Sequence, residues 1–201
     1  MAIDIEICST ALVTIGASPI SSFTDGSTEA TACNTLYEPT VQNELASHPW
    51  RFASNEQTIS RLSSTPIGKW SAAYQIPADL LSIRAVRSGD RVIPFDRFED
   101  NVFCDAGENE TLSIEGTWRV DEQFWPPYFR TLIEYKMASK LASALAERTD
   151  LAGQMDGMAM RQAATARHTD SKGRTTSKLR TSRLINRRFR NGHNNINADY
   201  E

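Results

Sequence analysis

The chain has 201 residues, of which 40% are hydrophobic, and its 22 Lys and Arg nearly balance its 25 Asp and Glu. This length fits one domain, or one domain with an appendage, and no apolar run approaches the length of a membrane span. The first ten residues, MAIDIEICST, carry acids where a secretory signal needs Lys or Arg, so the sequence predicts no export.

The charges are distributed unevenly along the chain. Residues 171–192 contain eight Lys or Arg and no acid, whereas residues 1–170 contain 14 basic and 23 acidic residues. The sequence therefore predicts a body with a net charge near −9, followed by a segment near +8.

Cysteine and histidine are too few and too scattered to predict a site. An odd number of distant cysteines argues against a disulfide framework, and no Cys-x-x-Cys pair suggests zinc. The residues are Cys8, Cys33, Cys104, His48, His168 and His193. We therefore expect buried free thiols, no metal site and no cofactor.

Two helices are predicted in the first quarter of the chain. The first covers residues 4–16, and Gly16 is placed to end it. The second begins near Asp25 or Ser27, either of which can cap a helix. Pro39 lies within its apolar pattern and predicts a kink, or a break and restart. The apolar faces of these helices contain Ile7, Ala11, Leu12, Ile15, Cys33, Leu36, Tyr37, Val41 and Leu45.

From residue 50 to about residue 120 the hydrophobic pattern changes to a period of two. Residues 80–96 alternate around Ser88-Gly89-Asp90, which is a strong hairpin signal. Residues 101–120 predict two more short strands around Gly107-Glu108-Asn109. About four strands of this length predict one small antiparallel sheet.

A third helix is predicted to start at Pro126-Pro127, and a fourth covers roughly residues 151–167. The apolar stripe of the third helix contains Phe129, Ile133, Met137, Leu141 and Leu145. Its small side, with Ala138, Ala142 and Ala146, is expected to form an inter-subunit helix face. On the fourth helix, Met155, Met158 and Met160 favour an adaptable docking surface and a gap-filling core about equally.

These elements predict an α+β fold, with an α-helical bundle, a small inserted antiparallel β-sheet and an extended C-terminal arm. The boundaries are 1–49 for the N-terminal bundle helices and 50–124 for the β-rich insertion. The C-terminal bundle helices cover 125–169, and the extended basic arm covers 170–201.

No motif predicts catalysis strongly. The acid pairs Glu99-Asp100 and Asp121-Glu122 could serve a glycosidase, but they adjoin turns and strand ends, where solvated acids are common. His168 with Cys104 lacks a nucleophile elbow, and the glycine spacing of phosphate loops is absent from the sequence. We therefore expect no catalytic residues.

The basic arm has three interpretations: a solvated tail, a nucleic-acid contact, or a segment that docks on an acidic protein surface. Apolar residues between the charges favour the third, since a phosphate binder does not need them. The candidate docking residues are Lys178, Leu179, Arg180, Arg183, Leu184, Ile185, Arg187, Arg188, Phe189 and Arg190.

Four segments resemble the tail tubular protein A family of short-tailed phages, also called head-to-tail adaptors or connectors. They are ALVTIGASPISSF, LYEP…ELASHPWRFA, YQIPADLLSIR and PPYFRTLIEYKMASKLA, and together they extend from about Ala11 to Ala146. The most specific parts are Ile15-Gly16 with Ile20 and Ser22, and the H-P-W-x-F-A element over residues 48–53.

This resemblance implies a structural virion protein of the neck and tail, made in the host cytoplasm. About twelve copies would form a homo-oligomeric ring between the portal protein and a tail nozzle of the tail tubular protein B type. Genomic DNA would pass through the lumen without specific binding, and tail fibres or spikes could attach outside. No membrane or cofactor would be involved. The arm lies outside the resemblance, and we expect it to point away from the lumen and dock on the portal.

Within such a ring subunit, five residues are expected to fix the angle between bundle and sheet. These hinge and packing residues are Tyr37, Pro39, Pro49, Trp50 and Phe52. Two alternative functions remain open: a cell-wall glycan hydrolase associated with the phage tail, and a nucleic-acid-binding module that acts through the basic arm.

Overall fold

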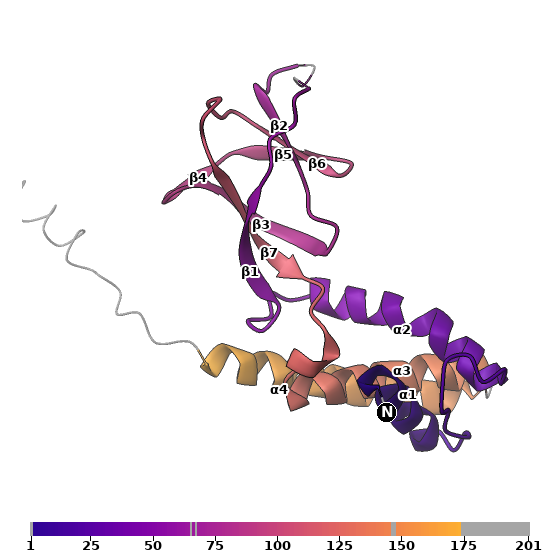
Figure 1. Ribbon diagram of the computed structural model, residues 1–201. Coiled ribbons are helices and arrows are strands. Elements are labelled where there is room, and N and C mark those ends of the chain that lie inside the picture. Colours follow the sequence, from indigo (N-terminus) through magenta and orange to yellow (C-terminus); the bar gives the residue numbers. More distant parts are fainter. Residues whose placement is uncertain (1, 65, 67, 146–147, 174–201) are drawn as a thin grey trace, which may run out of the picture.

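The computed structural model describes residues 2–64, 66, 68–145 and 148–173, and it confirms the α+β fold. Two helices come first, seven strands follow, and two helices come last. Figure 1 shows the helices together in one layer and the strands in a separate module that stands on it. The strand module is therefore an insertion between two pairs of bundle helices, as predicted. The predicted docking arm lies outside the described residues.

The first helix, α1 (Ile3–Thr14), ends in a Schellman motif. The amide of Ala17 donates to the carbonyl of Leu12 at 3.0 Å, and the amide of Gly16 donates to that of Val13 at 3.0 Å. Gly16 has a φ of 80°, which a residue with a Cβ adopts only at a cost. The predicted stop at Gly16 is confirmed.

The second helix, α2 (Thr28–Ala46), begins with Ser27 as its N-cap, because the Ser27 hydroxyl accepts from the amide of Ala30 at 3.1 Å. The helix continues through Pro39 as one element. The break-and-restart alternative is therefore wrong. Tyr37 and Val41, on either side of the proline, are buried in the bundle, and this packing stabilises the helix where one backbone hydrogen bond is missing.

The centre of the bundle is α3 (Pro127–Leu145), which packs against α1, α2 and α4 (Thr149–Lys172). The predicted stripe is confirmed, since its first four members are fully buried: Phe129, Ile133, Met137 and Leu141. α4 is longer than predicted and includes Asp170, so the arm does not begin at residue 170. Met155 is buried, whereas Met160 is 61% exposed.

The prediction that Ala138 and Ala142 form an inter-subunit face is wrong. Both are fully buried inside the subunit's own bundle, so a neighbouring copy has no surface of theirs to contact. Small side chains on α3 instead allow a close approach within the chain, where the Ser139 hydroxyl donates to the carbonyl of Ala152 on α4 at 3.0 Å. Ala146 lies outside the described residues.

The strands form two antiparallel sheets instead of the single four-stranded sheet that was predicted. The first has the order β1-β7-β3-β4 and the second has the order β2-β6-β5. The strands are β1 (Ser54–Ile59), β2 (Ala72–Gln75), β3 (Leu80–Ser88), β4 (Arg91–Ile93), β5 (Phe95–Phe98), β6 (Asn101–Cys104) and β7 (Leu112–Trp118). The hairpin between β3 and β4 is confirmed, with Ser88 opposite Arg91 and Gly89 at a φ of 54°.

The two strands predicted in residues 101–120 are present, as β6 and β7, but they belong to different sheets. Side chains from both sheets meet in a core of their own, separate from the bundle core. This second core includes Tyr74, Val86, Val102, Leu112, Ile114 and Trp118. Val120 packs against both cores and so links the two modules. All three cysteines are buried and free, as predicted.

We predict that Gly116→Ala destabilises the strand module. A Cβ at Gly116 on β7 would lie 2.3 Å from the Ser82 carbonyl oxygen on β3, a backbone atom that cannot move aside. We expect a loss of about 2 kcal/mol in the free energy of unfolding, measured by urea denaturation. Gly107→Ala is the control, because its nearest atom would be 3.9 Å away. Equal losses in the two variants would contradict the prediction.

Candidate functional site

The junction between the bundle and the strand module is the best-defined site for a structural role. Trp50 follows α2 and is fully buried, and its indole N–H donates to the carbonyl of Glu44 at 2.9 Å. The Trp50 ring packs against the Phe129 ring of α3 at a centroid distance of 5.1 Å, and Phe52 packs against the Phe129 ring at 4.9 Å. Trp125 contacts Phe129 from the chain that enters α3, at 5.0 Å. Two segments of chain connect the modules, one after α2 and one before α3, and the aromatic cluster holds both of them against α3.

A charged cluster lies at the same junction. Arg119, just after β7, donates through two nitrogens to both carboxylate oxygens of Glu38 on α2, at 2.9 Å each. It also donates to Glu122 at 2.6 Å, and Glu122 accepts from the Tyr37 hydroxyl at 3.2 Å. The Arg119 guanidinium lies 5.5 Å from the ring centre of Trp125. The guanidinium is planar and binds carboxylates on two sides, so it fixes both the distance from β7 to the bundle and their relative orientation.

The pKa values in this cluster reflect the balance between burial and charge. Burial alone would lower the pKa of Arg119, but hydrogen bonds and charges from Glu38 and Glu122 outweigh it and raise that pKa. The same hydrogen bonds lower the pKa of Glu38. Burial, followed by the charge of Glu122, raises the pKa of Tyr37 well above its ordinary value. Arg119 and Glu38 are therefore charged at neutral pH, and the Tyr37 hydroxyl keeps its proton.

Of the five predicted hinge residues, the structure brings Trp50 and Phe52 together in the aromatic cluster. Tyr37 belongs to the charged cluster instead, and Pro39 and Pro49 are both exposed. The sequence reasoning missed Arg119, Glu38 and Glu122 as a unit. Only their charges were visible there, because the contacts join residues 81 positions apart.

A second polar site lies at the end of α4, where Asp170 is only 5% exposed. Its carboxylate accepts from the backbone amide of Arg51 at 3.1 Å and from the Tyr128 hydroxyl at 2.9 Å. Burial, with the hydrogen bond and charge of Asp170, raises the pKa of Tyr128 to about 12. The end of a helix disfavours a carboxylate, so these donors stabilise an otherwise unfavourable charge. No periodicity in the sequence indicated this contact.

A groove of about 570 Å³ opens beside Asp170, between the bundle and the first sheet, and most of the residues that line it are polar. Its lining residues are His48, Pro49, Arg51, Ser54, Arg84, Glu115, Asp170 and Ser171. Glu115 already binds Arg87 at 3.0 Å and Arg84 at 3.1 Å, and these arginines lower its pKa. Burial and the charge of Arg167 lower the pKa of His48, so that this imidazole is neutral at neutral pH.

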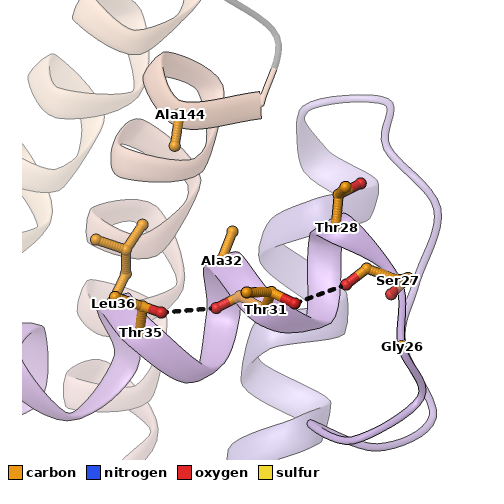
Figure 2. Close-up of a pocket in the computed structure, with 8 residues that line it drawn as sticks. All are labelled: Gly26, Ser27, Thr28, Thr31, Ala32, Thr35, Leu36 and Ala144. Carbon is orange, nitrogen blue, oxygen red and sulfur yellow. Dashed lines mark hydrogen bonds between the residues drawn. The ribbon is translucent and has the colours of Figure 1, made fainter.

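An apolar groove of about 420 Å³, drawn in Figure 2, lies at the start of α2, whereas the groove beside Asp170 follows the end of this helix. The apolar groove is formed by the start of α2 and by Ala144 of α3. The Thr31 hydroxyl donates to the carbonyl of Ser27 at 3.0 Å, and that of Thr35 donates to Thr31 at 2.9 Å. These hydroxyls are occupied inside the helix, so the groove offers packing surface and no converging catalytic groups.

The acid pairs lie on different elements. Glu99 and Asp100 form the turn between β5 and β6, whereas Asp121 and Glu122 lie next to the bundle, where Glu122 already binds Arg119. His168 is exposed on α4, and Cys104 is buried in the strand module. Neither arrangement brings a nucleophile and a base together.

Among the described residues, no group of His, Cys, Asp or Glu could hold a metal ion. The helices of this part of the chain also include none that is long and apolar enough to cross a membrane. No protein-family model matches the chain, and no curated protein sequence matches it. The fold and the geometry of these sites are therefore the basis for a proposal.

We predict that Arg119→Met loosens the junction, because it leaves Glu38 and Glu122 without their cation. The Arg119 side chain is only 20% exposed, so we expect a loss of about 2 kcal/mol in the free energy of unfolding. Arg91→Met is the control, since the Arg91 side chain is 69% exposed and solvent screens its ion pair with Glu110, so its loss should be much smaller.

The difference in the free energy of unfolding between wild type and Arg119→Met should depend on pH and decrease in acid. Arg119 lowers the pKa of Glu38 in the folded state, so this contribution is complete above the ordinary value of 4.5 and is lost as the pH falls through the folded-state pKa. The difference between wild type and Arg119→Met should therefore shrink in urea titrations below pH 4.5. A difference that grows in acid would contradict this account.

We predict that Asp170→Ala destabilises the protein by about 2 kcal/mol, because it leaves the Arg51 amide and the Tyr128 hydroxyl without their acceptor. Tyr128→Phe removes one of these hydrogen bonds and should cost about 1 kcal/mol. Asp150→Ala, on the exposed first turn of the same helix, is the control. Thermal unfolding followed by circular dichroism ranks the three variants, and a smaller effect at Asp170 than at Asp150 would refute the assignment.

Proposed function

We propose that the protein is a ring-forming head-to-tail adaptor of a short-tailed phage. It is a structural virion protein that joins the portal to the tail nozzle and lines the DNA channel. The observation that carries the proposal is the position of the H-P-W-x-F-A element. Its Trp50 and Phe52 lie in the aromatic cluster at the junction, and the Ala53 carbonyl accepts from the Trp118 amide of β7 at 2.8 Å.

A fixed junction is what a closed ring requires. An angular error in one subunit is repeated in every copy, so a ring of about twelve copies closes only if the angle between the modules varies little. The aromatic cluster and the Arg119 cluster support such a fixed angle, because they join the two modules by packing and by charge-assisted hydrogen bonds.

The charge of the body supports the same proposal. Residues 1–170 carry a net charge near −9, and a negative wall repels the phosphates of passing DNA, whereas a basic wall would bind them. The portal protein, a nozzle of the tail tubular protein B type and tail fibres or spikes are the proposed partners. The arm from Lys178 to Arg190 is the proposed portal contact, and the adaptor works without catalysis or a cofactor.

Native mass spectrometry of the chain, alone and mixed with portal protein, tests the proposal. We expect one large defined oligomer with portal, and the loss of this oligomer when the chain is cut after Gly173. The cut belongs there because Asp170 is part of the fold. A chain that stays monomeric with portal would overturn the adaptor. Binding of DNA that falls steeply with salt and requires the arm would support the nucleic-acid module instead.

A further inference from the structure

Acidic charge dominates the N-terminal part of the chain. Residues 1–49 contain six Asp or Glu and neither Lys nor Arg. Two of these acids are paired within the chain, Glu38 with Arg119 and Glu44 with Lys136. Asp25 and Glu29, at the start of α2, have no ion-pair partner among the described residues. This end of the bundle therefore offers carboxylates to a partner.

The groove beside Asp170, at the other end of α2, offers hydrogen-bond donors. Its two carboxylates are already satisfied, Asp170 by the Arg51 amide and Tyr128, and Glu115 by two arginines. The Arg51 side chain is exposed and makes no hydrogen bond within the part of the chain that the structure describes. A ligand in this groove must therefore supply an acceptor, and an anion fits best.

The groove favours a carboxylate over a phosphate. Glu115 and Asp170 line it, and two fixed negative charges repel a doubly charged group more strongly than a singly charged one. Arginine also pairs with a carboxylate in a planar, bidentate manner. A protein surface with exposed acids is thus a better match for this groove than a nucleic-acid backbone.

One copy cannot bring its own two surfaces together. Asp25 and Glu29 precede or begin α2, whereas His48 and Arg51 follow its end, and a helix of 19 residues is about 28 Å long. The contact must therefore join the front of α2 in one copy to the groove of another. Such a heterologous, head-to-tail contact propagates and closes into a ring when the rotation allows it.

We propose that the acidic start of α2, with Asp25 and Glu29, docks in the groove beside Arg51 of a second copy. The inference rests on the proposed ring function and names its inter-subunit contact. The apolar groove of Figure 2 lies at the same end of α2, so the contact also covers Ala32, Leu36 and Ala144. The contact is formed by charge-assisted hydrogen bonds over an apolar patch, and it weakens with salt.

Charge reversal with mixing tests this contact. Arg51→Glu and Glu29→Arg change exposed or half-exposed side chains, so both variants should fold. Glu29→Arg places a cation in the first turn of α2 and should lower the unfolding temperature slightly, and thermal unfolding checks both variants before assembly is measured. Glu29 accepts one local hydrogen bond, from the Thr28 hydroxyl at 2.9 Å, whereas Asp25 accepts from both the amide and the hydroxyl of the N-cap Ser27. Glu29 is therefore chosen over Asp25. Arg97→Glu, on an exposed strand away from the groove, is the matched control.

Sedimentation velocity and native mass spectrometry of the full chain with portal measure the assembly. Each single variant should assemble at least tenfold more weakly than wild type, and Arg97→Glu should assemble normally. An equimolar mixture of Arg51→Glu and Glu29→Arg should assemble again, because every contact between unlike copies is then complementary. Restoration by mixing is not expected from misfolded variants.

Three results would overturn the contact, and they differ from failure of the adaptor itself. If both single variants assemble as wild type does, the proposed contact is wrong, but the ring function is not contradicted. Failure of the mixture to assemble, when both variants are folded, also removes the contact. Arg51→Glu that assembles normally but loses affinity for a DNA duplex assigns the groove to phosphate instead. Wild type that stays monomeric with portal removes the ring function and the contact together.

Discussion

Arg119 joins the strand module to the bundle by charge, and much of the architecture depends on this one guanidinium. It lies between the carboxylates of Glu38 and Glu122 and beside the ring of Trp125, with 20% of its side chain exposed. Its amide also donates to the Asp79 carbonyl, at 2.8 Å, so its backbone is held by the strand module. A residue bound on both sides in this way transmits the orientation of one module to the other.

The two modules otherwise have separate interiors. The core of the strand module is the smaller of the two, so this module has less burial with which to offset a loss. The relative position of the modules then depends on a few contacts at the two connecting segments, which are the aromatic cluster around Phe129 and the cluster around Arg119. A force that moves one module relative to the other acts on these same contacts.

Local patterns made part of this fold predictable from the sequence. The buried stripe on α3, the Gly16 stop and the hairpin at Gly89 each follow from spacing or from a backbone angle within a few residues. β1 was missed because its sequence, SNEQTI, carries almost no hydrophobic signal; its pairing with β7 defines it. The division into two sheets depends on pairings between distant residues, which periodicity does not encode.

The candidate sites divide in the same way. Trp50 and Phe52 were recognisable because aromatic residues after a helix stop indicate packing. The prediction for Ala138 and Ala142 was wrong because small residues permit close approach to any helix, of the same chain or of another. Both are buried within their own bundle. Asp170 carried no signal at all, since its partners, Arg51 and Tyr128, lie 119 and 42 residues away.

The hydrogen bonds of Asp170 also have a mechanical consequence for the end of α4. Tension applied to the chain beyond Gly173 reaches the last turn of α4, where unaided backbone hydrogen bonds would break one after another. The Asp170 carboxylate instead ties this turn to the Arg51 amide, next to Trp50, and to Tyr128 on α3. Three elements therefore share the load in parallel, and the helix resists being peeled away from its free end.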